Sequence, residues 1–208
     1  RNGEKARRNG ASEWSCVPKN RHNEASNRSP NYAGPRQPQV HGTGLMDTKS
    51  TVFCERLLDV IEQDIVPLTC AGVEVGNKVF GAAILRKSDL SLVMAGTNNE
   101  IENPLNHGEI STLNAFYKLP IEGRPDTKDC VFVSTHEPCS LCLSAITWGG
   151  FDNFFYLFGY DDTRDAFKIP HDLKILSEVF NIQQGNYARK NAFWECRGLI
   201  EMSEAIGG

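Results

Sequence analysis

The sequence has no long hydrophobic run. Its apolar residues occur in runs of only a few residues, whereas a helix that spans a membrane requires about 20 consecutive apolar residues. No apolar segment of the kind found in secretory signal peptides occurs near the first residue. We therefore expect neither a membrane span nor a secretory signal.

The sequence also lacks a regular cysteine framework. Its seven cysteines stand at positions 16, 54, 70, 130, 139, 142 and 196, an odd number without a recurrent spacing. Disulfide scaffolds of secreted proteins usually have an even number of cysteines in a much shorter chain. The pattern therefore predicts reduced thiols and a cytoplasmic location.

Charge is unevenly distributed along the chain. Residues 1–45 contain eight basic and three acidic side chains, whereas the remaining residues contain 14 basic and 23 acidic ones, a net charge of −9. The first 45 residues include only ten apolar residues and show no helical or alternating period. This composition predicts a disordered basic tail or a fragment end. A basic arm that binds nucleic acid is the less favoured interpretation, because the charges are scattered and do not form a dense run of Lys and Arg. We expect residues 46–208 to form one acidic domain.

Hydrophobic periodicity predicts that helices and strands alternate in this domain. The expected strands cover residues 79–85, 90–95, 130–134 and 154–158, and the first two form a hairpin. Three of the expected helices begin near residues 50, 107 and 138. Two further helices are expected over residues 172–180 and 188–202. Ser50 or Thr51 can cap the first helix, Pro67 is expected to disturb its end, and Pro138 suits a first helical position. This order indicates an α/β layer architecture with helices on both faces of a sheet.

Two short motifs contain residues of the kinds that bind zinc. The first is HGE at residues 107–109, and the second is PCSLC at residues 138–142. Cys139 and Cys142 are three residues apart, so one helical turn presents both sulfurs on the same side, and His107 supplies a third ligand. Two thiolates and one imidazole suit Zn²⁺ and leave a fourth position open for water, as in catalytic zinc sites.

Glu109 is the candidate proton shuttle of such a site. It stands two residues beyond His107, where it can face a zinc-bound water without binding the metal. Zinc lowers the pKa of its water to near neutrality, and a carboxylate can then accept the proton and return it elsewhere. A purely structural site would instead need a fourth protein ligand. Cys130 and His136 are candidates by number, although we expect Cys130 in a core strand and His136 in a loop.

The pattern HxE followed by PCxxC resembles the zinc-binding motif of the cytidine and deoxycytidylate deaminase superfamily. The resemblance covers most of residues 50–202. Four segments are similar to the guanine deaminase branch of that superfamily: GNKVFGAAIL, GTNN, EPCSLCLSAITW and TRDAFKIPHD. The sequence departs from the family at Gly108, where alanine is usual, and in a shorter loop between Asn98 and His107.

The resemblance implies a fold, a cofactor and a set of site residues. The fold would be a three-layer α/β/α sandwich with a mixed, mostly parallel five-stranded sheet. His107, Cys139 and Cys142 would bind Zn²⁺, and Glu109 would transfer protons. The resemblance also implies four substrate contacts: Asn98 would hydrogen-bond the base, Phe80 and Trp148 would wall the pocket, and Asp172 would reach the purine in the partner's site of a swapped homodimer.

The implied reaction is hydrolytic deamination of a nucleobase or nucleoside, as in guanine deaminases. Zinc-bound hydroxide would attack the ring carbon that carries the amine, and ammonia would leave. Two alternatives remain, a tRNA adenosine deaminase and a non-catalytic partner subunit that keeps zinc. The net charge of −9 argues against a nucleic-acid substrate, because phosphate binding normally uses clustered Lys and Arg. The presence of Glu109 argues against a subunit that has lost catalysis.

Overall fold

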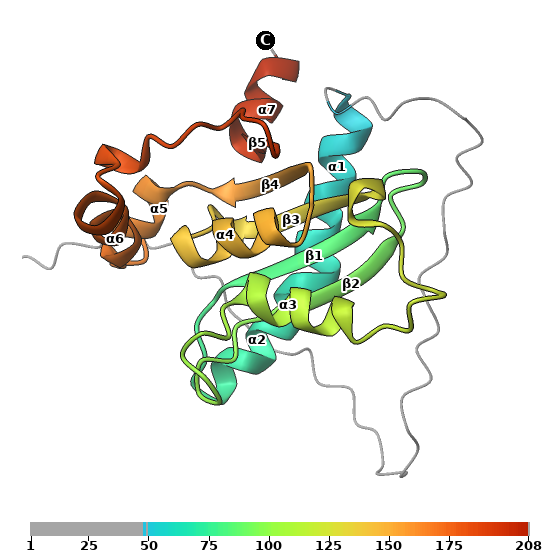
Figure 1. The fold of residues 1–208 in the computed structure, drawn as a ribbon, viewed down its shortest axis with the longest axis horizontal. Helices are drawn as coiled ribbons and strands as arrows, with labels where there is room; N and C mark the ends of the chain where they lie inside the picture. The colour runs from blue at the N-terminus through green and yellow to red at the C-terminus, as the bar shows by residue number, and fades with distance from the viewer. Residues whose placement is uncertain (1–47, 49, 208) are drawn as a thin grey trace, which may run out of the picture. The chain divides into compact units, whose positions relative to one another are not determined.

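Five strands form one mixed sheet in the computed structural model, which describes residue 48 and residues 50–207 (Figure 1). The strands are β1 (Gly81–Arg86), β2 (Leu92–Thr97), β3 (Cys130–His136), β4 (Asn153–Phe158) and β5 (Glu195–Gly198). The helices are α1 (Thr51–Val60), the π-helix η1 (Ile61–Ile65), α2 (Val66–Glu74), α3 (Gly108–Tyr117), α4 (Ser140–Trp148), α5 (Tyr160–Asp165), α6 (His171–Phe180) and α7 (Leu199–Gly207). Two 3₁₀ turns, η2 (Thr127–Asp129) and η3 (Gln183–Gly185), complete the described elements. The predicted basic tail, residues 1–45, lies outside the described residues.

The strand order is β2-β1-β3-β4-β5. β1 pairs with β2 and with β3 in antiparallel orientation, whereas β3 with β4 and β4 with β5 are parallel. The predicted hairpin and the mixed sheet are confirmed, but the parallel pairings do not outnumber the antiparallel ones. The reason is that β1 lies between β2 and β3. The connection through α3 therefore joins two strands that run in the same direction but are not neighbours.

Helices cover both faces of the sheet, as the three-layer prediction requires. Successive residues of β1 belong to different hydrophobic clusters, because side chains alternate across a strand. Ala83 and Leu85 pack in a cluster with residues of α1, η1 and α7. Ala82 and Ile84 pack in a second cluster with residues of α3 and α4. Figure 1 shows α3 and α4 over one face of the sheet and α1 and α2 behind it.

The first helical segment continues beyond Pro67, contrary to our expectation. Ser50 caps α1 by accepting a hydrogen bond from the Phe53 N–H. The chain then forms the π-helix η1, in which the Val66 N–H bonds to the Ile61 carbonyl, five residues earlier. Pro67 follows directly in the first turn of α2, where its missing N–H removes no bond that the new turn requires. The wide turn thus lets the helix accommodate the proline.

The prediction for residues 188–202 was wrong in its first part. These residues include β5, which pairs in parallel with β4 at the edge of the sheet, and only the last of them belong to α7. Cys196 and Gly198 are buried and alternate with half-buried neighbours, which is the pattern of a short strand. The short helix α5 was also missed, whereas α6 lies where the sequence predicts a helix.

Two helix N-termini place the predicted motifs. His107 is the N-cap of α3 and Cys139 is the N-cap of α4. Pro138 therefore precedes the cap and does not occupy the first helical position. At the start of α3, a methyl group on Gly108 would lie 2.7 Å from the Phe80 carbonyl oxygen and 2.7 Å from the Gly81 Cα. The absence of a side chain at Gly108 thus allows α3 to pack directly on the backbone at the start of β1.

His136 is the last residue of β3 and not a loop residue. Its side chain is 5% exposed, and its ring contacts the rings of Phe80, Phe158 and Phe167. The Nδ1 atom lies 3.0 Å from Thr135 Oγ1, and the Nε2 atom has no hydrogen-bond partner in the structure. Burial lowers the pKa of His136 to about 4, so the ring is neutral at physiological pH.

Among the described residues, no helix combines the length and the apolar character that crossing a membrane requires.

We predict that Gly108→Ala destabilises the protein by about 1–3 kcal/mol, because the new methyl group meets backbone atoms that must move. Gly123→Ala is the matched control, since its methyl group would meet only the Pro120 carbonyl oxygen, at 4.0 Å. That variant should stay within about 0.5 kcal/mol of the unmodified protein. Urea denaturation measures both changes. An unchanged unfolding midpoint for Gly108→Ala would show that the two backbones are not in close contact.

We also predict that His136 destabilises the fold in acid. Its pKa is near 6.5 in the unfolded chain and about 4 in the folded chain. The unfolded state therefore binds the proton first, and stability falls as the pH decreases from about 6.5 towards 4. His136→Gln should flatten this dependence by up to about 1.4 kcal/mol per pH unit. Denaturation with a chelator present, at several pH values, tests this. Equal slopes for both proteins would contradict it.

Candidate metal centre

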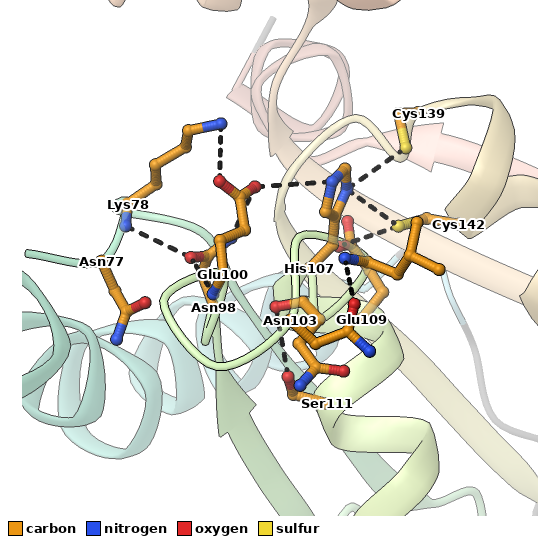
Figure 2. Close-up of polar contacts among 12 residues, drawn as sticks. Asn77, Lys78, Asn98, Glu100, Asn103, His107, Glu109, Ser111, Cys139 and Cys142 are labelled. Carbon is orange, nitrogen blue, oxygen red and sulfur yellow. Dashed lines mark hydrogen bonds and ion pairs between the residues drawn. The ribbon is translucent and has the colours of Figure 1, made fainter.

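The three predicted metal ligands converge in the structure. His107 comes from the start of α3, and Cys139 and Cys142 come from the start and first turn of α4. Their ligand atoms all lie within 4.8 Å of one another. His107 Nδ1 lies 3.4 Å from Cys139 Sγ and 3.7 Å from Cys142 Sγ. Figure 2 shows the imidazole ring directed at both sulfurs.

These distances fit a tetrahedral zinc ion. Zn–S bonds of about 2.3 Å and Zn–N bonds of about 2.0–2.1 Å, at a tetrahedral angle, place a sulfur and a nitrogen about 3.6 Å apart. The two measured distances bracket this value. No fourth histidine, cysteine or acidic ligand joins this group among the residues that the structure describes. The sequence offered two residues as a fourth zinc ligand. Cys130 is instead a buried core residue of β3, and His136 is enclosed by aromatic rings.

The charges of the group suit a dication. The pKa of Cys139 is lowered to about 4 by hydrogen bonds from the Cys142 thiol and from His107. The pKa of Cys142 is raised by its interaction with Cys139, by burial and by the negative charge of Glu109, so this thiol keeps its proton. The bond to Cys139 also raises the pKa of His107, to about 9. Negative charge is therefore concentrated on sulfur, and both remaining protons are exchangeable for a metal ion.

Glu109 lies beside the ligands in the first turn of α3 and is 5% exposed. Its Oε1 atom accepts a hydrogen bond of 2.7 Å from the Ser134 hydroxyl, and its Oε2 atom accepts one of 3.3 Å from Cys142 Sγ. Burial raises the pKa of Glu109, and the negative charge of Cys139 raises it further. The carboxyl group can therefore hold a proton at a pH where an exposed glutamate would not.

Glu100 is a site residue that the sequence did not reveal. Its Oε1 atom lies 3.4 Å from His107 Nε2, on the side of the ring opposite the two sulfurs. It also accepts a hydrogen bond from Asn98 Nδ2 and pairs with the Lys78 ammonium at 2.7 Å. Burial raises the pKa of Glu100, but the bonds from Lys78 and Asn98 outweigh it, so the pKa is lowered overall.

A cavity of about 90 Å³ opens beside the metal ligands. It is lined by Lys78, Phe80, Glu100, His107, Glu109, His136, Glu137, Cys139, Thr163, Ile169, His171 and Asp172. Glu109 of α3 therefore faces the same cavity as residues of α6 and the residue at the end of β3. The pKa of Asp172 is raised to about 6 by burial and by the negative charge of Cys139.

The four predicted substrate contacts occupy different places. Phe80 and Asp172 line the cavity, and Asp172 does so within its own chain. Asn98 is fully buried, and its Oδ1 atom accepts hydrogen bonds from the Lys78 and Glu100 N–H groups. Trp148, at the end of α4, is 91% exposed and does not line this cavity. Their roles in substrate binding stay predictions.

Ser134 and Glu100 are site residues that the sequence did not indicate, and His136, which the sequence offered only as a fourth zinc ligand, lines the cavity instead. Ser134 could not be found because it is a residue of strand β3 whose hydrogen-bond partner, Glu109, is distant in the sequence. Glu100 stands two residues after Asn98, and its acidic side chain in the loop before the metal-binding histidine was the one available signal. His136 was assigned to a loop because strand β3 continues two residues beyond its apolar run.

Comparisons with known proteins agree with this geometry. Residues 65–158 match the family model of the cytidine and deoxycytidylate deaminase zinc-binding region. A guanine deaminase of Bacillus subtilis is 32% identical over 104 residues, which are 49% of this chain and 64% of that protein. The match thus spans less than two thirds of the curated relative.

Two solved structures are similar to the structure of this chain. A guanine deaminase from Nitrosomonas europaea aligns with a TM-score of 0.50 at 19% identity, over 84% of this chain and 85% of that one. A guanine deaminase from Bacillus subtilis aligns with a TM-score of 0.49 at 25% identity, over 72% of this chain and 91% of that one. The first supports the fold that the sequence resemblance implied. Residues 65–158 are thus similar to the cytidine and deoxycytidylate deaminase zinc-binding region, and the curated protein that the chain matches is a guanine deaminase.

Proposed function

We propose that this protein is a zinc-dependent hydrolytic deaminase of a nucleobase or nucleoside, with guanine as the expected substrate. The observation that carries the proposal is the placement of Glu109. Its carboxyl group is buried beside a group of three metal ligands and at the wall of a cavity. A structural zinc site has no use for such a carboxyl group, whereas hydrolysis requires one.

The residues of the chain have separate tasks in this reaction. Zinc, when bound by His107, Cys139 and Cys142, supplies an activated water as the nucleophile. Glu109 would accept a proton from the activated water and pass it to the ring nitrogen next to the reacting carbon. It would then take the second proton from the hydroxyl group added to that carbon and pass it to the amine, which leaves as ammonia. The Ser134 hydroxyl donates to Oε1 of Glu109 and orients the carboxyl group, leaving Oε2 on the side of the metal ligands.

The cavity suits a small uncharged base. Its volume of about 90 Å³ is small compared with the roughly 300–1,000 Å³ of sites for drug-sized ligands. Phe80 offers an apolar wall, and Asp172 is a partner for the N–H groups of an aminated ring. Two acidic residues of the lining, Glu100 and Asp172, disfavour a substrate phosphate in the same space.

The protein is also expected to work in the cytoplasm. Five described cysteines carry free thiols: Cys54, Cys130, Cys139, Cys142 and Cys196. Cys70 is disulfide-bonded, so the prediction of reduced thiols was wrong for that residue. Metal binding needs the thiolates of two of them, and the reducing cytoplasm maintains such thiols.

The zinc-loaded protein should release ammonia from guanine, and Glu109→Ala should lower this rate by at least about 100-fold because the proton shuttle is lost. Zinc content, measured by elemental analysis, should remain that of the unmodified protein. Glu122→Ala, which changes an exposed glutamate outside the cavity, is the matched control and should keep full activity.

A panel of guanine, cytosine, adenine, their nucleosides and a tRNA anticodon stem loop tests the substrate class in the same assay. Activity on the stem loop alone would replace the proposal with a tRNA adenosine deaminase. No ammonia from any of them, with zinc bound, would favour a non-catalytic zinc-binding subunit. Equal rates for Glu109→Ala and the unmodified protein would contradict the shuttle.

We further propose that the protein is a homodimer in which Asp172 contacts the substrate. Large apolar side chains that are exposed in the single chain support the dimer, among them Trp148, Val179, Phe180 and Phe193. Asp172 lines the cavity of its own chain, which supports a contact within one protomer and not with the substrate of the other.

Mixed dimers test this assignment of Asp172. Glu109→Ala and Asp172→Ala should each be inactive, and dimers that combine one chain of each should be inactive too, because each chain then carries a damaged site. Light scattering after gel filtration measures the dimer, and ammonia release measures activity after the two variants are co-refolded. Recovery of up to a quarter of full activity would show that Asp172 acts in the site of the partner. A fully active monomer would contradict the dimer.

A further inference from the structure

The loop between β2 and α3 contacts the edge of the His107 ring that faces away from the two sulfurs. His107 Nδ1 is directed at Cys139 and Cys142, whereas its Nε2 lies 3.4 Å from Glu100 Oε1 (Figure 2). Glu100 is itself mostly buried, with 19% of its side chain exposed. A carboxylate is therefore present at the one ring nitrogen of His107 that does not face the metal ligands.

This placement decides which tautomer of His107 is available. A neutral imidazole has one protonated and one free nitrogen, and a metal ion binds the free one. A carboxylate accepts hydrogen bonds and donates none. Glu100 therefore favours the tautomer with the proton on Nε2, which leaves the Nδ1 lone pair for the ion. In known metalloproteins, carboxylates in this position fix the ring and increase the basicity of the ligand.

Glu100 is in turn held on both sides. Asn98 Nδ2 donates a hydrogen bond of 3.1 Å to Oε1, and the Lys78 ammonium lies 2.7 Å from Oε2. The Asn98 amide is oriented by two further bonds, because its Oδ1 atom accepts from the backbone N–H groups of Lys78 and Glu100. Asn98 is fully buried. Its hydrogen bonds support Glu100, and Asn98 itself is not among the residues that line the cavity.

The charges around the centre also balance. Two thiolates neutralise a divalent ion, so an additional buried carboxylate beside His107 would be uncompensated by the ligands alone. Lys78 supplies that compensation through its contact with Glu100. The three residues thus form a chain in which Lys78 and Asn98 hold Glu100, and Glu100 faces the imidazole.

We propose that Glu100 is a positioning residue that sets the tautomer and orientation of His107 for zinc, and that Asn98 acts through Glu100. This inference rests on the zinc site of the proposed function but does not depend on which base is deaminated. It assigns Asn98 a different task from hydrogen bonding to the substrate.

Zinc affinity tests the proposal without any substrate. Competition with a chromophoric chelator should show that Glu100→Ala binds zinc about 10–100-fold more weakly than the unmodified protein. Glu100→Gln keeps an oxygen acceptor and loses the charge, so its loss should be smaller. Glu102→Ala is the control, because Glu102 is an exposed acidic residue of the same loop and should bind zinc as the unmodified protein does.

Two further measurements separate positioning from a structural role. Without metal, Glu100→Gln and the unmodified protein should have similar melting temperatures, whereas added zinc should raise the melting temperature of Glu100→Gln less. In the Co²⁺-substituted protein, the visible absorption bands should shift in Glu100→Gln and stay unchanged in Glu102→Ala. Asn98→Ala should weaken zinc binding when Glu100 is present but should have no further effect in a protein that already carries Glu100→Ala. The effects of substituting two residues that act as a unit are not additive.

Equal zinc affinity and equal Co²⁺ spectra for Glu100→Ala, Glu100→Gln and the unmodified protein would overturn the proposal. A lowered melting temperature without metal, with zinc affinity unchanged, would assign Glu100 a structural role and overturn it as well. Failure of the proposed function has a different signature. In that case the zinc affinities differ as predicted, but no base in the substrate panel releases ammonia.

Discussion

The close packing of α3 on the start of β1 is the constraint on which the site depends. The N-terminus of α3 carries His107 and Glu109, and the N-terminus of α4 carries Cys139 and Cys142. Because Gly108 lets the α3 backbone meet Phe80 and Gly81, the imidazole lies within 3.7 Å of both sulfurs. Two helices that follow different strands of the sheet thereby bring the three candidate ligands and the carboxyl group proposed as the shuttle to a single point.

The electrostatics of the centre follow from that convergence. Negative charge on sulfur attracts a dication, and the same charge, together with burial, raises the pKa of Glu109. On the opposite side of His107, the Lys78 ammonium lowers the pKa of Glu100. Two glutamates near one metal group thus have opposite shifts, which suits proton transfer at Glu109 and a fixed charge at Glu100.

The fold and the metal group could be predicted from the sequence because both have local signatures. The hairpin, the three layers and the helix starts near residues 107 and 138 rest on periodicity and on motifs of a few residues. By contrast, β5 is short and is formed by pairing with β4, and the continuation of the first helix past Pro67 needs a π-helical turn that no residue pattern announces. Such features depend on tertiary contacts.

The same distinction applies within the site. The candidate zinc ligands are residue types with strong chemical preferences, so their spacing was enough to propose them. The partners of Glu109 and His107 are instead set by contacts between distant segments, as with Ser134, or by the path of a loop, as with Glu100. The substrate contact that the resemblance implies for Asn98 stays a prediction, and the hydrogen bonds of Asn98 in the structure go to the Glu100 carboxylate and to the backbone N–H groups of Lys78 and Glu100.

The central claim is that His107, Cys139 and Cys142 hold one zinc ion with one position open to solvent. X-ray absorption at the zinc edge of the metal-loaded protein tests it most directly. We predict one zinc per chain with two sulfur neighbours at about 2.3 Å and two nitrogen or oxygen neighbours at about 2.0–2.1 Å. Three or four sulfur neighbours, or the absence of zinc from the purified protein and after incubation with it, would contradict the account.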